Sequence, residues 1–159
     1  MFKKLFKKNE KLSWLVPLTG TVKSITAAPD TAIAKRMLGD GFCVDPTNGK
    51  VYSPVNGSIV MVFPTKHAIG IQADTGHEIL IHVGIDTVNL NGEGFEIYVQ
   101  AGDKVQAGDL LLDVDIDSIK DKIPSLVTAV VITNLEGKTV ELSKLGEAKQ
   151  GDAITLEII

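Results

Sequence analysis

Short runs of apolar residues, separated by turn residues, recur along the whole chain. The segment 16–25 (VPLTGTVKSI) is echoed by 53–62 (SPVNGSIVMV), because both read Pro-x-x-Gly followed by a strand-like run. A second echo relates 101–116 to 145–158, where a glycine, a polar stretch and Gly-Asp precede an alternating apolar and polar run. Two pairs of segments with the same pattern predict a duplicated β architecture.

Turn signals divide the chain into many short strands, which is typical of an antiparallel β-sandwich or barrel. They are Thr19-Gly20, Asn48-Gly49, Asn56-Gly57, Thr75-Gly76 and Asn91-Gly92. The segment 115–124 (DIDSIKDKIP) is the best helix candidate, with an Asp cap and isoleucines at helical spacing. A helical turn is also possible within 29–37. We therefore expect an all-β fold, a β-sandwich or barrel-sandwich hybrid with internal duplication and one or two short helices.

The size and charge of the chain limit its class. A chain of 159 residues suits one domain, which we place at residues 16–159. The net charge of −4 argues against a nucleic-acid partner, which would favour a basic surface. Cys43 is the only cysteine, so no intramolecular disulfide can form and a reducing compartment is expected. No apolar run is long enough to cross a bilayer.

The first 15 residues form a basic tail in this interpretation. They lack the long apolar core and the cleavage site of a signal peptide, which predicts a cytoplasmic protein. Phe2, Leu5 and Phe6 could share one face of a short helix beside four lysines, a pattern that indicates weak membrane contact through residues 1–8. A disordered, solvated tail explains the same residues and is favoured because such a helix would be short.

All three histidines of the chain lie in one short segment, residues 66–88. Two β-branched runs surround the turn ADTG in that segment and predict a hairpin. A loop at residues 73–76, or a two-residue loop at Asp74-Thr75, places His67 directly opposite His82, with Cβ atoms about 4.5–5.5 Å apart. A three-residue loop would shift the register by one residue and break this pair. His77 points to the other face.

Two adjacent imidazoles suit several roles. They could be a structural pair, part of a metal site, an acid–base pair or a phosphoryl carrier, and two nitrogens alone leave a zinc site incomplete. Thr65 could fix the tautomer of His67, and Gly84 lets the backbone approach His82. Asp86 is equally explained as a turn cap. Geometry alone leaves the four roles open.

The segment 77–95 (HEILIHVGIDTVNLNGEGF) resembles the signature of the glucose-type enzyme IIA domains of the bacterial phosphoenolpyruvate-dependent sugar phosphotransferase system. The similarity continues through residues 29–46, 54–71 and 101–115, and covers roughly 16–159. It implies a β-sandwich that carries a phosphoryl group between proteins. We expect no cofactor or metal to be required.

The resemblance also implies roles for individual residues. His82 would accept the phosphoryl group from the histidine of HPr, which presents a basic, partly apolar surface, and pass it to a cysteine of a sugar-specific IIB domain. His67 and Thr65 would support the transfer, and Asp30 and Asp86 would flank the site. His77, in contrast, has no matching role.

The family docks its partners on a shallow apolar ring around the histidines. The matching positions are Ile33, Met37, Leu38, Phe63 and Leu80. The hairpin pattern agrees for Leu80, which shares the predicted face of His82. Core packing is the simpler explanation for Ile33 and Leu38.

Two other classes match short motifs. A zinc peptidase of the lysostaphin type uses His-x-x-x-Asp, which residues 82–86 fit, but it also needs a His-x-His pair that this chain lacks. A biotinyl or lipoyl carrier is suggested by residues 102–111. Such a carrier needs a lysine at a hairpin tip, whereas Lys104 lies within the strand segment and no Met-Lys-Met occurs.

Overall fold

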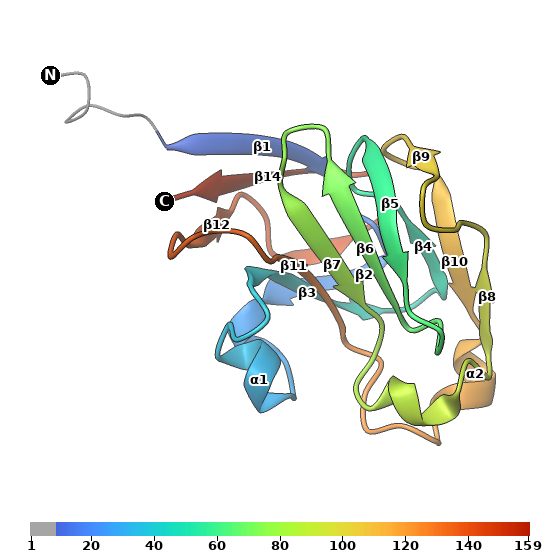
Figure 1. Ribbon diagram of the computed structural model, residues 1–159. Helices are drawn as coiled ribbons and strands as arrows, with labels where there is room; N and C mark the ends of the chain where they lie inside the picture. The colour runs from blue at the N-terminus through green and yellow to red at the C-terminus, as the bar shows by residue number, and fades with distance from the viewer. Residues whose placement is uncertain (1–8) are drawn as a thin grey trace, which may run out of the picture.

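Antiparallel strands make up most of the regular secondary structure in a computed structural model that describes residues 9–159 (Figure 1). The strands are β1 (Glu10–Leu15), β2 (Gly20–Ser24), β3 (Asp40–Pro46), β4 (Lys50–Tyr52), β5 (Gly57–Val62), β6 (Ala68–Ala73), β7 (Glu78–His82), β8 (Phe95–Ile97), β9 (Lys104–Val105), β10 (Leu110–Val114), β11 (Thr128–Ile132), β12 (Val140–Leu142), β13 (Gly146–Ala148) and β14 (Ala153–Ile158). The helical turns are η2 (Ile25–Ala27), α1 (Thr31–Ala34), η3 (Thr87–Leu90) and α2 (Ile116–Ile119).

The order of the strands repeats itself from the two ends of the large sheet. That sheet runs β13-β2-β3-β11-β7-β6-β5-β9, and the smaller sheets run β1-β14-β12 and β4-β10-β8. Reading inward from either end of the large sheet, β13 corresponds to β9, β2 to β5, and β3 to β6. The predicted β-sandwich with internal duplication is therefore confirmed, and the repeated sequence segments occupy equivalent strands.

The Pro-x-x-Gly repeat begins equivalent strands in the two halves. Gly20 opens β2 and Gly57 opens β5. A Cβ atom at either glycine would overlap a carbonyl oxygen of the neighbouring strand, that of Asp45 or that of Gln72. Glycine is required at both positions because the adjacent backbone approaches closely.

The main core lies between the large sheet and the two small ones. Trp14 of β1 packs against Phe42 of β3, with ring centroids 6.3 Å apart, and both side chains are buried. A second apolar cluster fills the space beneath η2 and α1, on the other face of β3 and β11. It contains Cys43, which is fully buried, and burial raises the pKa of this thiol to about 11.

The helical turns η2 and α1 cover one face of the large sheet only as far as β7. Leu80 of β7 is only partly buried against the second cluster. Beyond it, Val60 and Met61 of β5 are 52% and 53% exposed, where a β-bulge interrupts the pairing of β5 with β6. One face of β5, β6 and β7 is therefore open beside the covered region.

The boundary that the sequence predicted at residue 16 needs correction. Residues 10–15 form β1 and pair with β14 in the register Glu10↔Ile158, so they belong to the sandwich. Leu12 and Trp14 alternate with exposed residues and are 4% and 3% exposed. The lysine-rich start of the chain obscured this short alternating pattern. The proposed membrane contact of residues 1–8 lies outside the described residues.

The two predicted helices are present as single turns. Asp115 caps α2 by accepting a hydrogen bond from the Ser118 N–H, and Ile119 is fully buried. Asp30 caps α1 in the same way, through the Ile33 N–H. Within residues 9–159, no helix is long and apolar enough to cross a membrane.

Candidate functional site

The hairpin of β6 and β7 has a different register from the predicted one. Its loop contains three residues, Asp74-Thr75-Gly76, so Gln72 pairs with Glu78 and Ala68 pairs with His82. Gly76 has a φ of +92°, which permits the bulged turn that fits a three-residue loop. The expectation that His67 lies directly opposite His82 is therefore wrong.

The two histidines nevertheless come together at the end of the hairpin. Their ring centroids are 4.9 Å apart and the ring planes meet at 79°. His67 precedes β6 and follows Lys66, whose φ of +64° turns the chain before the regular strand begins. The strict alternation of strand faces does not apply at this residue, so its ring can reach the face of His82.

The backbone around Gly84 orients the ring of His82. Nδ1 of His82 lies 2.9 Å from the Gly84 carbonyl oxygen, and because a carbonyl can only accept, Nδ1 carries the hydrogen. The neutral ring therefore has its free lone pair on Nε2. Gly84 has a φ of +71°, and an added Cβ would lie 2.6 Å from Cγ2 of Thr87.

Thr87 holds this turn in place, a role that was missed at the sequence level. Its hydroxyl donates to the Val83 carbonyl at 2.6 Å, and the residue is completely buried. The sequence feature that could have indicated this role is the position of Thr87 in the run GIDTV, after the glycine and aspartate of the turn. Val88, the next residue, was also missed; it is 49% exposed and lines the site.

His67 is held from its own side of the site. Its Nδ1 lies 2.8 Å from the Thr65 hydroxyl, which can donate to this nitrogen or accept from it. Phe63 packs its ring against that of His67 at a centroid distance of 5.5 Å. His67 is only 3% exposed, whereas His82 is half-buried.

The surroundings favour the neutral form of both rings. Burial lowers the pKa of His67, and the adjacent His82 lowers it further. Burial also lowers the pKa of His82, while the hydrogen bond to Gly84 and the charges of Asp30 and Asp86 oppose that shift. A neutral imidazole can act as a nucleophile, and a protonated one cannot.

A shallow depression of about 200 Å³ opens above the two rings. It is lined by both histidines, by the acidic residues flanking them and by apolar residues from the α1 and η3 regions: Asp30, Ala32, Ile33, Leu38, His67, His82, Ile85, Asp86, Thr87 and Val88. Asp86 is the N-cap residue of η3 with a φ of +58°, and its side chain makes no cap hydrogen bond. The simple explanation that Asp86 caps the turn therefore fails, and its carboxylate stays near His82.

The residues expected in the docking ring occupy different depths. Met37 is 72% exposed and Leu38 is 39% exposed. Phe63 and Leu80 are half-buried. Ile33 is 4% exposed and packs in the second apolar cluster, so it supports this surface from beneath and offers a partner little area.

His77 lies outside this site. Its Nε2 is 3.3 Å from the Glu10 carboxylate, and its Nδ1 is 2.7 Å from the Thr75 hydroxyl. These contacts tie the hairpin loop to β1 and give His77 a structural role. Among residues 9–159, no three histidine, cysteine, aspartate or glutamate side chains gather as metal ligands, so the peptidase alternative gains no support.

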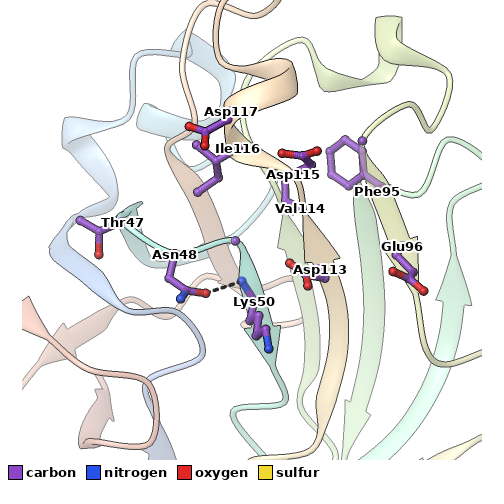
Figure 2. A pocket seen from close by; sticks show the side chains of 12 residues that line it. Thr47, Asn48, Lys50, Phe95, Glu96, Asp113, Val114, Asp115, Ile116 and Asp117 are labelled. Atoms are coloured by element: carbon purple, nitrogen blue, oxygen red, sulfur yellow. Dashed lines mark hydrogen bonds between the residues drawn. The ribbon is translucent and has the colours of Figure 1, made fainter.

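A larger cavity of about 680 Å³ lies between β4, β8, β10 and the start of α2 (Figure 2). The carboxylates of Glu96, Asp113, Asp115 and Asp117 line it together with Lys50. Asn48 accepts a hydrogen bond from the backbone N–H of Lys50 at 2.9 Å. This cavity shares no residue with the depression at the histidines, and its lining includes no histidine, cysteine or serine. The paired histidines are therefore the better candidate site.

Comparison with known proteins identifies the family of the chain. The sequence profile of the family described as phosphoenolpyruvate-dependent sugar phosphotransferase system, EIIA 1, matches residues 12–138. The PTS system glucose-specific EIIA component of Bacillus cereus is 54% identical over 140 residues, covering 86% of this chain and 84% of that protein. The EIICBA component of Staphylococcus carnosus is 45% identical, and the match covers 88% of this chain and 21% of that longer protein.

A solved structure shares the fold over nearly the whole chain. Glucose permease IIA from Mycoplasma capricolum superposes with a TM-score of 0.87 at 45% sequence identity, and the match covers 93% of this chain and 96% of that one. The chain therefore belongs to the EIIA 1 family of the phosphoenolpyruvate-dependent sugar phosphotransferase system.

Proposed function

We propose that Nε2 of His82 accepts a phosphoryl group from the histidine of HPr and passes it to a cysteine of a IIB domain. The observation that carries this proposal is the hydrogen bond from His82 Nδ1 to the Gly84 carbonyl. It leaves the lone pair on Nε2 as the only nucleophilic position of the neutral ring. The shallow, partly apolar depression gives a partner protein room to approach this atom.

The chemistry needs few groups from this chain. The Nε2 lone pair forms the new N–P bond while the bond from phosphorus to the donor nitrogen breaks, and the electron pair leaves with the donor. The His82 ring keeps its hydrogen on Nδ1 and becomes positively charged. The Gly84 carbonyl stabilises that charge without taking the proton, so the ring is ready to release the phosphoryl group to the next acceptor.

His67 is proposed to stabilise the phosphoryl group in transit. When the Thr65 hydroxyl donates to Nδ1 of His67, the hydrogen of that ring is on Nε2. This N–H is available to the phosphoryl oxygens beside the adjacent His82 ring. A donor placed in advance where charge develops accelerates transfer with little reorganisation.

The names of the relatives support a glucose-type sugar for this proposal. The names of the Bacillus cereus and Mycoplasma capricolum proteins state a glucose-specific EIIA component. We infer a glucose-type role in sugar uptake for this chain, in the cytoplasm, with no cofactor or metal. In the Staphylococcus carnosus protein a matching segment is part of an EIICBA component, so such domains occur both as separate chains and within larger proteins.

Reconstitution with phosphoenolpyruvate, enzyme I and HPr tests the proposal. The protein should gain one phosphate that acid removes and base does not, and His82→Ala should abolish the labelling. His67→Gln keeps a donor, so it should still accept phosphate but pass it to IIB about 10²–10³-fold more slowly. Labelling that persists at His67 in His82→Ala would contradict the acceptor assignment. A normal rate of transfer to IIB in His67→Gln would contradict the supporting role.

A further inference from the structure

The C-terminal end of α1 has a backbone conformation that normally requires glycine. Arg36 has a φ of +60°. Its N–H donates to the Ile33 carbonyl at 3.0 Å, and the N–H of Met37 donates to the Ala32 carbonyl at 2.9 Å. This pair of hydrogen bonds is the Schellman motif, in which glycine usually occupies the position held here by Arg36. A residue with a Cβ is strained there, so other contacts must compensate.

Asp40 supplies the compensating contact. Its Oδ1 lies 3.2 Å from Nε of Arg36, and the residue is 4% exposed. The same oxygen accepts the Gly41 N–H at 2.8 Å, and Oδ2 accepts the Val140 N–H at 2.9 Å. Asp40 therefore fixes the guanidinium of Arg36 to the start of β3 and to β12.

The segment between Arg36 and Asp40 reaches the histidine site. Met37 and Leu38 are both exposed, and Leu38 lines the depression together with His67 and His82. Gly39 has a φ of +146°, and an added Cβ would overlap the Ile132 carbonyl, so the chain lies directly on β11. Arg36 and Asp40 themselves do not line the depression.

We propose that the Arg36–Asp40 ion pair is a positioning device that holds Met37 and Leu38 outward for docking of phospho-HPr. This inference rests on the proposed function. Because neither residue lines the depression around the histidines, the pair should act on the affinity for the partner. The rate of phosphoryl transfer within the complex should stay the same.

The variant Arg36→Gly distinguishes a positioning role of the Arg36–Asp40 ion pair from a purely structural role. Glycine suits the backbone conformation better than arginine does, so the turn stays favourable while the ion pair is lost. We expect KM for phospho-HPr to rise about tenfold, as for loss of one important interface contact, with kcat unchanged. Arg36→Lys should recover part of the affinity. Lys35→Gln is the matched control, since it removes a positive charge from the neighbouring exposed residue and should leave KM unchanged.

Each outcome of this experiment has a definite meaning. Circular dichroism checks the fold, and if Arg36→Gly does not fold, Arg36→Gln, which loses the guanidinium and its charge, should show the same separation of KM from kcat. An unchanged KM in the folded variant, a fall in kcat alone, or an equal rise in KM for Lys35→Gln would overturn the inference. Failure of the unmodified protein to accept phosphate would instead overturn the proposed function.

Discussion

At His82, one carbonyl oxygen gives the two ring nitrogens different roles. Nδ1 donates to the Gly84 carbonyl at 2.9 Å, and Nε2 keeps the free lone pair of the neutral ring. At His67 the hydroxyl of Thr65 contacts Nδ1 at 2.8 Å. All four of these residues were predicted from the sequence, because they lie in two short motifs, and the structure brings them together. It could not identify Thr87, because the importance of that residue lies in its complete burial beneath Gly84.

The charge of Asp30 should control the protonation of His82. A nearby carboxylate favours the imidazolium and so raises the pKa of His82 against the lowering effect of burial. Asp30→Asn keeps an oxygen that can cap α1 through the Ile33 N–H but removes the charge. The pKa of His82 should therefore fall further, and the neutral, nucleophilic ring should persist to lower pH.

Titration of the His82 ring proton resonances by NMR measures this effect directly. Asp86→Asn is the comparison, since the charge of Asp86 has a smaller influence on the pKa of His82 than that of Asp30. Asparagine also suits the left-handed backbone conformation of Asp86. A midpoint that moves to higher pH in Asp30→Asn, or that does not move, would show that Asp30 does not act on this ring through its charge.

At the scale of elements, the length and backbone conformation of the turns determine the register of the strands, which the apolar pattern alone does not fix. The apolar alternation predicted the β6–β7 hairpin, but several loop lengths fit ADTG, and the three-residue loop shifts every pair by one. The histidines still meet because Lys66 turns the chain just before β6. In β1, the alternation of Leu12 and Trp14 was present in the sequence, but it covers only a few residues after a lysine-rich segment. Short elements at a change of composition are the hardest to predict from pattern alone.

The turn after β7 should tolerate no side chain at Gly84. Gly84→Ala combines a φ of +71° with close contacts to Thr87 Cγ2 at 2.6 Å and the Ser125 carbonyl at 3.1 Å. The turn must move, and the carbonyl that holds Nδ1 of His82 must move with it. We expect the free energy of unfolding to fall by more than the ~1–2 kcal/mol that a positive φ alone costs, and phosphorylation of His82 to slow.

Gly102→Ala is the control for backbone strain alone. Gly102 has a φ of +98° and no atom within 4 Å of an added Cβ. Denaturant unfolding and the rate of phosphorylation should be measured for both variants. Equal loss of stability in the two, with normal phosphorylation of Gly84→Ala, would mean that the position of the Gly84 carbonyl does not matter for the site.

At the scale of the whole molecule, the duplicated sandwich leaves one face available for partners. The helical cover given by η2 and α1 ends near β7, and the depression at the histidines lies where the cover ends. Exposed apolar residues there are flanked by Asp30 and Asp86, and the chain carries a net charge of −4. This arrangement suits a basic, partly apolar partner, with the acidic rim acting mainly on the rate of association.

Met37→Asp tests the docking surface. Met37 is 72% exposed, so the fold should survive, but a buried, unpaired charge in the complex should weaken docking at every salt concentration. Leu145→Asp makes the same change in charge at a residue that is 61% exposed and lies between β12 and β13. Titration with HPr should show a weaker complex for Met37→Asp and little change for Leu145→Asp. Equal weakening in both variants would place the docking surface elsewhere.

Salt should weaken docking of the unmodified protein as well. Charges at the rim are screened over about 8 Å at physiological ionic strength. Phosphorylation by HPr should therefore slow as salt rises, chiefly through a higher KM. Affinity that does not depend on salt would exclude a role for the acidic rim.

The most direct measurement of the central claim is the position of the phosphorus atom on the protein. The protein labelled with ¹⁵N in its histidines and phosphorylated by HPr should be studied by NMR for coupling between phosphorus and the ring nitrogens. The account predicts coupling to Nε2 of His82, with the hydrogen retained on Nδ1 and still donated to Gly84. Phosphorus bonded to Nδ1 of His82, or to either nitrogen of His67, would contradict it.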